Sequence, residues 1–536
     1  MAVLESRYDP QGPGVADNRA RHLELLDGVR ALEAQVVAAS QRAEAKFRGR
    51  GQLLPRERID LLIDRGSPFL ELSTLAGLGM HDDNGKTNVY GGGLICGIGV
   101  VSGVRVMVSA NDAAIKGGAA HPMGVEKAIR AQEIALENRL PFIQLVESAG
   151  ANLLLQSEMF VRGGATFANM ARMSAAGLPV VSVVHGSSTA GGAYQTGLAD
   201  HVILVRGRSK VFLAGPPLLK AATGEIATDE ELGGAEMHTT VSGLGDYLAE
   251  DDADAIRIAR DIVASWNWDR AGEAAAAPGP IHDAEDILSV CSPDYRKPYD
   301  ARELIARLVD GSDFTDFKPE WGMSTVTGFA RIEGHAVGIL ANNGPIDADG
   351  AAKAAHFIQL CCQSGASLVF LQNTTGFIVG VEAERAGIVK NGSTMIQAVT
   401  NATVAKITLQ IGGAFGAGHY AMCGRSFAPR FIFSWPTNRI AVMGGEQAAK
   451  VMQIVMEDGM RARGMTPPDG AFEEQTKMIV GGYDIQSTAL FGTARLWDDG
   501  IIDPRQSRRV VGLCLAIAAE GDRRTVRPNV FGVARL

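Results

Sequence analysis

The chain has 536 residues, of which 46% are hydrophobic and 21% charged, values that predict a folded protein of two to four domains and exclude a disordered chain. Its 51 basic and 60 acidic residues give a formal charge of −9, which argues against a nucleic-acid-binding protein. No apolar run reaches the ~18 residues of a membrane-spanning helix, and the start lacks a signal or transit pattern, so we expect a cytoplasmic location.

The six cysteines form no CxxC pair, which argues against a zinc ribbon and a disulfide framework. The sequence also lacks HExxH, a Cys/His metal set and the GxSxG elbow of serine hydrolases. We therefore predict no metal in this chain. Chemistry that relies on backbone groups is favoured over chemistry that relies on side chains.

The first half of the chain predicts a run of alternating strands and helices. Residues 97–112 (GIGVVSGVRVMVSAND) are typical of two strands that turn at Gly103. Residues 131–150 (AQEIALENRLPFIQLVESAG) predict an amphipathic helix, a buried strand and a small-residue loop ending at Gly150. A glycine cluster, GSSTAGGAY, follows, with Gly191 lying 41 residues beyond Gly150 (191 − 150).

A linker separates this half from the next. Residues 271–280 (AGEAAAAPGP) have the Ala/Pro/Gly composition of a connection between domains. We therefore predict an N-terminal domain over residues 1–275 and a C-terminal domain over residues 276–536.

The second half repeats these landmarks in the same order. Residues 328–343 (GFARIEGHAVGILANN) match the first strand pair, with the turn at Gly334, and residues 356–376 (HFIQLCCQSGASLVFLQNTTG) match the helix, strand and loop. The cluster GGAFGAGHY follows, with Gly416 lying 40 residues beyond Gly376 (416 − 376). Four landmarks at nearly constant spacing predict a gene duplication; the alternative is that two α/β domains share common turn chemistry.

Each glycine cluster is expected between a strand and a helix, where free backbone N–H groups and the positive end of the helix dipole meet. That arrangement stabilises an oxyanion, and small residues let a carbonyl oxygen approach the amides. The rival interpretations are a ligand-free crossover and a phosphate loop. The phosphate loop is disfavoured because neither GxxxxGK[ST] nor a complete GxGxxG fingerprint is present.

Several longer motifs resemble one family. They are RGQLLPRERIDLLID near Arg50, TAGGAY at Thr189, FLAGPPLLKAATGEIATDEELGGAEMH from Phe212, NTTGFIVG at Asn373, GAFGAGHYAMCGR from Gly413 and SWPTNRIAVMGGEQAA from Ser434. Together they are similar to the carboxyltransferase (β) subunits of biotin-dependent acyl-CoA carboxylases, in the methylcrotonyl-CoA and geranyl-CoA branch. The resemblance covers nearly the whole chain and implies two tandem crotonase-like α/β domains of ββα units, in agreement with the duplication.

The resemblance also implies which residues form the sites. The N-terminal domain is expected to hold the acyl-CoA, with the amides of Gly191 and Gly192 stabilising the enolate oxygen. The C-terminal domain is expected to receive carboxybiotin against the amides of Ala417 and Gly418. Around these four catalytic positions, the implied acyl-CoA residues are Ala149, Gly150, Gly163 and Ala190, and the implied biotin residues are Thr375, Gly376, Phe377 and Gly416.

The implied partner is an α subunit that carries biotin and uses ATP, because this chain contains neither an AMKM-type biotinylation site nor an ATP-binding motif. Family resemblance further implies a hexamer of β subunits, with active sites between the N-terminal domain of one protomer and the C-terminal domain of another. The alternatives are a propionyl- or acetyl-CoA carboxylase β subunit, a biotin-dependent decarboxylase subunit, and a non-catalytic CoA-binding scaffold.

Two local features bear on the chemistry. Gly163 and Gly164 stand where methylcrotonyl-type members have a bulky aromatic residue, which predicts a roomier acyl pocket and a longer branched substrate such as geranyl-CoA. The alternative is that these glycines only shape a loop. His419 adjoins the expected biotin amides; a role in packing or hydrogen bonding is favoured there over general-base catalysis.

Overall fold

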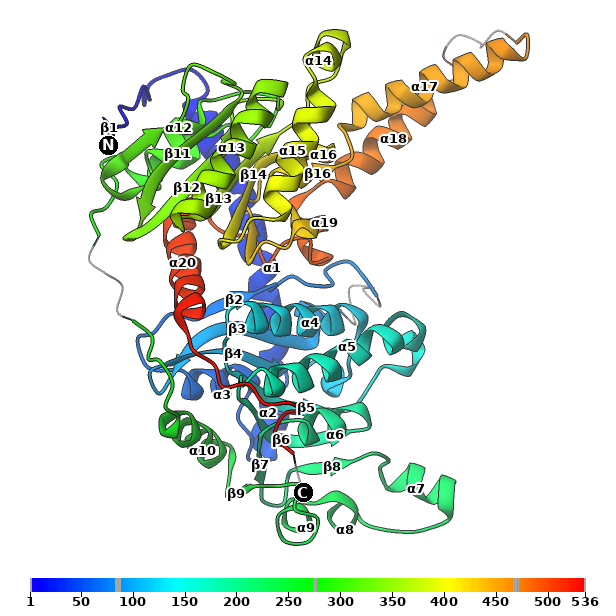
Figure 1. The fold of residues 1–536 in the computed structure, drawn as a ribbon. Helices are drawn as coiled ribbons and strands as arrows, with labels where there is room; N and C mark the ends of the chain where they lie inside the picture. Colours follow the sequence, from blue (N-terminus) through cyan, green and yellow to red (C-terminus); the bar gives the residue numbers. More distant parts are fainter. Residues whose placement is uncertain (1, 82–87, 273–276, 466–469, 471, 535–536) are drawn as a thin grey trace. The chain divides into compact units, whose positions relative to one another are not determined.

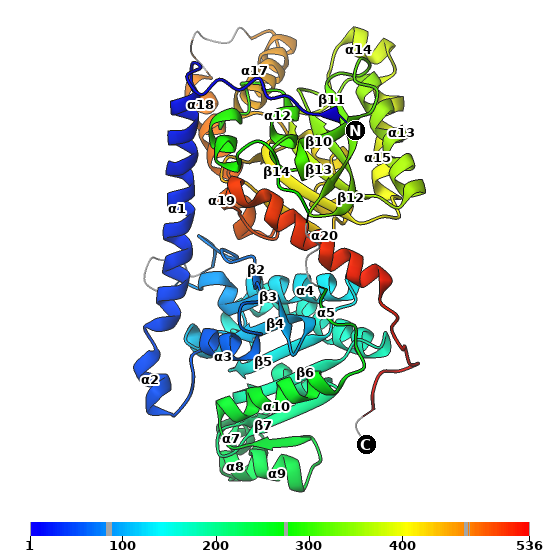
Figure 2. The same cartoon turned by 90° about the vertical axis from the view of Figure 1, so that its left-hand side faces the viewer.

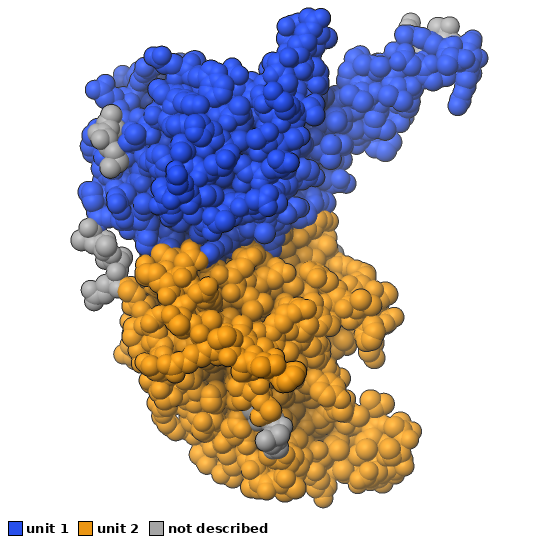
Figure 3. Space-filling model, viewed as in Figure 1, with its two compact units in different colours: residues 1–30, 274–493, 497–516 blue, residues 31–273, 494–496, 517–536 orange. Residues whose placement is uncertain are grey.

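Two eight-stranded sheets organise the computed structural model, which describes residues 2–81, 88–272, 277–465, 470 and 472–534. The chain divides into two compact units, coloured separately in Figure 3. Residues 31–273, 494–496 and 517–536 form what we call the N-terminal unit, and residues 1–30, 274–493 and 497–516 form the C-terminal unit. Residues 273–276 of the predicted linker lie outside the described residues, and the boundary at 275/276 stays a prediction.

The sheet of the N-terminal unit is antiparallel at one end and parallel in its remainder. Its first three strands form a meander, and the parallel strands follow through helical crossovers, as period-two and buried apolar runs predict. In sheet order the strands are β2 (Leu70–Leu72), β3 (Leu94–Val101), β4 (Val104–Asn111), β5 (Phe142–Ser148), β6 (Val180–Thr189), β7 (His201–Val205) and β9 (Tyr247–Ala249), and β8 (Lys210–Phe212) pairs with the end of β6.

Helices cover both faces of this sheet (Figures 1 and 2). One face packs its valines and isoleucines on α3 (Pro55–Leu62) and α10 (Asp252–Ser265), and this is the main apolar core of the unit. The crossover helices α4 (Pro122–Glu137) and α5 (Gln156–Ala175) contact each other. The shorter helices are α2 (Glu44–Gly49), α6 (Gly191–Gly197), α7 (Pro216–Thr223), α8 (Asp229–Gly233) and α9 (Ala235–Thr240).

The sheet of the C-terminal unit has the same order. Its strands are β1 (Ala2–Val3), β10 (Asp313–Asp316), β11 (Thr325–Ile332), β12 (His335–Asn342), β13 (Ser367–Thr374), β14 (Lys406–Phe415) and β15 (Phe431–Ser434), and β16 (Arg439–Ala441) pairs with the end of β14 as β8 does with β6. Helices α13 (Ala348–Ser364) and α15 (Ile388–Thr400) build its core with β12 and β13. The predicted duplication is therefore confirmed at the level of strand order.

The remaining helices complete the chain. They are α1 (Val15–Gln41), α11 (Ile287–Val290), α12 (Ala301–Ile305), α14 (Val381–Arg385), α16 (Gly416–Ala421), α17 (Gly445–Ala462), α18 (Glu473–Gln486), α19 (Ala489–Ala494) and α20 (Ser507–Arg523). Among the described residues, no helix is both long and apolar enough to cross a membrane. No group of His, Cys, Asp and Glu suited to a metal ion occurs in the same part of the chain.

The duplication extends to single hydrogen bonds. Ser102 and Gly103 turn the chain between β3 and β4 with positive φ values of 47° and 78°, and Glu333 and Gly334 turn it between β11 and β12 with 49° and 82°. Asp64 accepts both amides of the first turn at 2.9 and 2.7 Å. Asp310 accepts both amides of the second at 2.8 Å each. Two positive φ values are typical of the hairpin turn that matches strand twist, so both predicted turns are confirmed.

Candidate active site

The ends of β5 and β6 separate, and this separation makes room for a site. Their pairing runs in step from Phe142–Val180 to Val146–Val184 and resumes only at Ser148–Ser188. One residue of β5, Glu147, therefore faces a longer stretch of β6, which displaces the loop after Ser148. The same shift occurs in the C-terminal unit, where Gln372–Gln410 is followed by Thr374–Ala414.

The first glycine cluster lies where β6 turns into α6. Ala190 has φ 55° and ψ −119°, a strained conformation for a residue with a Cβ, and it ends the strand abruptly. Among the described residues, none accepts a hydrogen bond from the amide of Gly191 or Gly192. These two amides belong to the first turn of α6, where helix N–H groups have no partner inside the helix. They are therefore available to an oxygen atom of a ligand.

A cavity of about 490 Å³ lies against these amides. Of the predicted acyl-CoA residues, Gly150, Gly163, Ala190, Gly191 and Gly192 line it. Ala149, also predicted, is exposed and does not line it, because its neighbour Gly150 carries the contact. The described lining residues include none with a charged side chain, so the cavity suits an uncharged chain.

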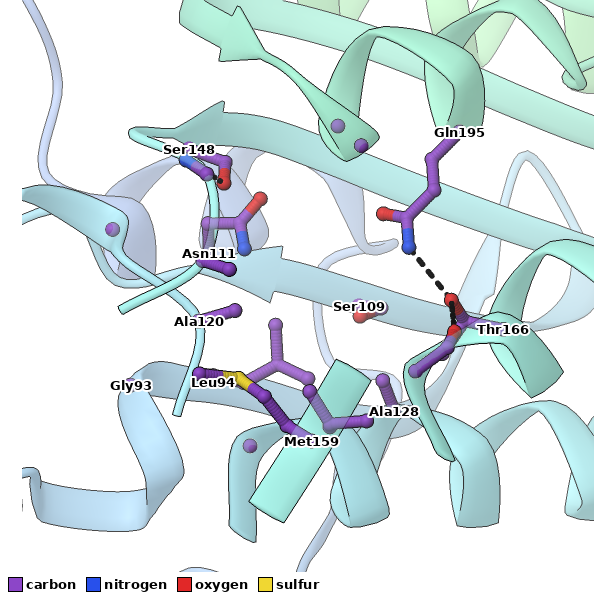
Figure 4. A pocket seen from close by; sticks show the side chains of 18 of the residues that line it. Gly93, Leu94, Ser109, Asn111, Ala120, Ala128, Ser148, Met159, Thr166 and Gln195 are labelled. Carbon is purple, nitrogen blue, oxygen red and sulfur yellow. Dashed lines mark hydrogen bonds between the residues drawn. The ribbon is translucent and has the colours of Figure 1, made fainter. Parts of the chain in front are cut away.

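The cavity has an outer end near the loop and a deep end between α5 and α6. Figure 4 shows Ser148, Asn111 and Ala120 on one side and Gln195 and Thr166 on the other, with Leu94, Met159 and Ala128 along the wall between them. Gly163, on α5, has its nearest potential Cβ neighbour, the Cγ1 atom of Val125, at 3.9 Å. The space that an aromatic side chain at this position would occupy is therefore part of the cavity.

Sequence reasoning missed the polar residues of the deep end. Gln132, Gln144 and Thr166 are almost fully buried, and with Gln195 they line the cavity. One signal was available: Gln144 interrupts the apolar side of the buried run FIQLVES. A glutamine in the middle of a buried strand needs hydrogen-bond partners, and it therefore marks a polar site inside the fold.

The second glycine cluster forms the equivalent turn in the C-terminal unit. Ala190 and Gly416 share φ 55°, and both follow the last paired residue of their strand. Gly191 is thus equivalent to Ala417, and Gly192 to Gly418. Spacing had paired Gly191 with Gly416; the structure corrects that alignment by one residue.

The predicted biotin residues come together around this turn. Gly418 lies so close to Gly376 that a Cβ on Gly418 would be 2.7 Å from the Gly376 Cα atom. Ala417 is exposed, and no described residue accepts a hydrogen bond from the Ala417 or Gly418 amide. Thr375 is exposed beside Gly376, and Phe377 pairs with Ile346 in a short parallel bridge. Small residues and two open amides fit the ureido oxygen of biotin.

His419 follows these amides but is buried, and it hydrogen-bonds Gln372 through Nδ1. Burial lowers the pKa of His419 to about 4. The ring is therefore uncharged at neutral pH and a weak base, in keeping with the predicted packing role.

A buried charge network lies beneath the acyl-CoA loop. Arg58 donates to Glu147 at 2.9 Å and to Asp252 at 3.1 Å, and His185 donates from Nδ1 to Asp252 at 3.0 Å. Gln52 ties Glu147 to the carbonyl of His185. Because Glu147 precedes Ser148 and His185 lies on β6, the network fixes the two strand ends where they separate.

Two pKa shifts follow from this network. Burial raises the pKa of Asp252, but hydrogen bonding by His185 and the amide of Leu53, with the charge of Arg58, outweighs it and gives a pKa of about 2. Burial, followed by the charge of Arg58, lowers the pKa of His185. At neutral pH the network therefore contains an ionised Asp252 and a neutral His185.

The family model described as carboxyl transferase domain matches residues 46–532. This chain belongs to the carboxyl transferase family. The predicted family and the predicted fold class, two tandem crotonase-like α/β domains, are confirmed.

Known carboxyltransferases of three organisms are similar to this one over most of its length. The crystal structure of the geranyl-CoA carboxylase β subunit of P. aeruginosa is 53% identical, covers 100% of both chains and has a TM-score of 0.93. The biotin-dependent 3-methylcrotonyl-coenzyme A carboxylase beta1 subunit of Mycobacterium tuberculosis is 47% identical, over 97% of this chain and 98% of its own. The mitochondrial methylcrotonoyl-CoA carboxylase β chain of Dictyostelium discoideum is 46% identical, over 100% and 91%.

Proposed function

We propose that this chain is the β subunit of a biotin-dependent acyl-CoA carboxylase that acts on a branched unsaturated acyl-CoA longer than 3-methylcrotonyl-CoA, such as geranyl-CoA. The observation that carries the proposal is a pair of unpartnered amides at the N-terminus of α6, against an uncharged cavity, with an equivalent pair on α16. Two enolate-like oxygens need two sets of donors, and the duplicated fold offers both.

The roles of the residues follow from where negative charge develops. The thioester carbonyl would lie against the amides of Gly191 and Gly192, which would stabilise its oxygen as the substrate loses a proton. No charged side chain among the described lining residues is placed to take that proton. Bound carboxybiotin supplies the carboxyl group. Ala417 and Gly418 would hold its ureido oxygen, and Gly376 and Gly416 would leave room for it.

Replacing Gly192 tests the oxyanion role. The potential Cβ of Gly192 is in ordinary contact, 3.4 Å from the Ser188 Oγ atom, so Gly192→Val is expected to fold while its methyl groups block the oxygen site. Loss of an oxyanion donor lowers kcat by about 100- to 1,000-fold. The assay is ATP-dependent incorporation of labelled bicarbonate into geranyl-CoA by the β subunit with its α subunit.

Gly459→Val is the matched control, because Gly459 lies on α17 with open space around it. It is expected to retain full turnover and the same melting temperature. A Gly192→Val enzyme with unchanged kcat would refute the role of these amides.

Replacing Gly163 tests the chain length of the substrate. Gly163→Phe places an aromatic ring in the cavity next to Val125, which removes the space for a long acyl group. We expect kcat/KM for geranyl-CoA to fall at least about 100-fold relative to that for 3-methylcrotonyl-CoA, because a well-packed cavity tolerates little added volume. Equal losses for both substrates would show that Gly163 does not determine chain length, and Gly459→Phe controls for the added ring.

The biotin-carrying α subunit and a β hexamer are part of this proposal. Relatives named as biotin-dependent support the partner. Co-purification of an ATP-dependent biotin carboxylase with the tagged chain supports a carboxylase, whereas co-purified membrane subunits would indicate a decarboxylase. Light scattering of the purified β subunit tests the hexamer.

A further inference from the structure

The glutamines at the deep end of the acyl cavity share one pattern of hydrogen bonding. Gln132 donates from Nε2 to the carbonyl of Thr166 at 3.1 Å, and Gln144 donates from Nε2 to the carbonyl of Gln195 at 3.2 Å. Gln195 in turn donates from Nε2 to the Thr166 hydroxyl at 2.8 Å (Figure 4). In all three carboxamides the nitrogen is bonded to the protein.

The chemistry of the acceptors fixes the orientation of these amide groups. A backbone carbonyl only accepts, so the atoms of Gln132 and Gln144 that face one must be nitrogens. The Thr166 hydroxyl gives its proton to the carbonyl of Gly163 at 2.7 Å and therefore accepts from Gln195. All three amide oxygens consequently point away from these partners.

None of the three amide oxygens has a hydrogen-bond donor among the described residues. Gln132 is 3% exposed and Gln144 8% exposed, and the Oε1 atom of Gln132 is fully buried without a partner. A buried amide oxygen without a donor costs about 1–3 kcal/mol. Three acceptors in one uncharged cavity therefore suit a neutral ligand group that donates hydrogen bonds.

This acceptor cluster lies far from the site of carboxyl transfer. Gln144 is four residues from Ser148 along β5, or ~13 Å at the rise of a strand, and Ser148 adjoins Gly192. Gln132 is eight residues beyond Gly124 on α4, ~12 Å along the helix, and both line the cavity. A group bound there belongs to the distal end of an acyl chain.

We propose that the preferred substrate carries a hydroxyl group at the distal end of its branched acyl chain, and that the amide oxygens of Gln132, Gln144 and Gln195 accept hydrogen bonds from it. The inference rests on the proposed carboxyltransferase function and adds a substrate class to it. A pure hydrocarbon chain leaves these acceptors unpaired, and sites built to bond a hydroxyl discriminate strongly against its absence.

The test compares geranyl-CoA with its terminally hydroxylated analogue, ω-hydroxygeranyl-CoA, in the bicarbonate assay with the complete α and β enzyme. The expected result is a kcat/KM at least about tenfold higher for the hydroxylated substrate. Equal or better use of geranyl-CoA overturns the inference and leaves the proposed function standing. Carboxylation of neither substrate, by an α subunit that carboxylates free biotin, overturns both.

Variants tie the preference to these side chains. Gln144→Leu and Gln195→Leu are each expected to abolish the preference, with melting temperatures confirming that they fold. Gln359→Leu is the matched control, because exposed Gln359 on α13 also donates from Nε2 to a backbone carbonyl, that of Ala355. A hydroxyl preference that survives in both cavity variants overturns the assignment.

Discussion

Ala190 illustrates how much of the site depends on one backbone conformation. Its φ of 55° turns β6 directly into α6, and Gly416 does the same between β14 and α16. Glycine adopts this conformation readily, whereas alanine pays about 1–3 kcal/mol of strain for it. That strain persists because the surrounding strand pairing holds the turn, and the turn exposes the amides of Gly191 and Gly192.

Asp252 makes stability depend on pH at the scale of one residue. Its pKa of about 2 in the folded protein lies below its ordinary value of 3.8, so the stabilisation is fully present above pH 3.8 and is lost as the pH falls toward 2. The shift corresponds to about 2 kcal/mol. We expect Asp252→Asn to lower the free energy of unfolding near neutral pH, and the difference from wild type to shrink as the pH falls from 5 toward 2.

Urea denaturation of the β subunit at a series of pH values measures this difference. Asp261→Asn is the control, because Asp261 forms an exposed ion pair with Arg257. A constant difference between wild type and Asp252→Asn across the acid range would contradict the prediction.

At the scale of elements, the two halves repeat their fastenings as well as their strands. Lys127 on α4 is buried and donates to the carbonyls of Gly91 and Leu94, and Lys353 on α13 donates to those of Lys318 and Trp321. In each half a buried ammonium group fixes the segment before the first long strand to the first crossover helix. Such shared details indicate that both halves retain the geometry of one ancestral unit.

The hairpin turns give a prediction for two elements at once. Asp64 and Asp310 each accept two turn amides, and hydrogen bonds to a charged group contribute about 1.5–3 kcal/mol. We expect Asp64→Ala and Asp310→Ala each to lower the free energy of unfolding by ~2 kcal/mol or more. Because Asp64 also pairs with Arg260 and Asp310 with Arg508, the two losses are expected to be similar.

Chemical denaturation followed separately in each unit checks this expectation. Exchange of backbone amides at residues 102–103 and 333–334 reports the local effect of each substitution. Unchanged protection of a turn after loss of its own aspartate would show that the carboxylate does not hold it.

At the scale of the whole molecule, the end of the chain returns to the N-terminal unit. Residues 517–536 belong to that unit, and Glu520 forms a bidentate pair with Arg105 of β4 at 2.8 and 3.1 Å. Both side chains are less than a tenth exposed. Arg524 donates to the carbonyls of Asn138 and Arg139 after α4. The last helix thereby closes a unit that begins more than 400 residues earlier.

Removing Glu520 is expected to weaken this closure. Glu520→Ala leaves Arg105 buried without its carboxylate, which costs about 3–5 kcal/mol, whereas the double variant Arg105→Met/Glu520→Ala removes both charges and is expected to lose less. A double-mutant cycle in urea measures the coupling. Additive losses from the two single variants would contradict a coupled buried pair.

The sequence by itself determined the strand pairs, the crossover helices, the duplication and the family, because these rest on local periodicity, on turn glycines such as Gly103 and Gly334, and on long contiguous motifs. It also predicted four positions, Gly191, Gly192, Ala417 and Gly418, whose amides the structure leaves unpartnered. Their roles in catalysis stay predictions. The one-residue shift between Gly191 and Gly416 escaped detection because glycine spacing does not reveal which residue has the positive φ.

Only the tertiary structure decided which residues share the cavity and which chain segments share a unit. Gln132, Gln144, Thr166 and Gln195 come from a helix, a strand and two further helices, and their common cavity depends on packing between distant segments. The same holds for Glu520 and Arg105, because an ion pair between residues so far apart in the chain has no local pattern. Local patterns encode elements, whereas the partners of a buried polar group are set by how those elements pack.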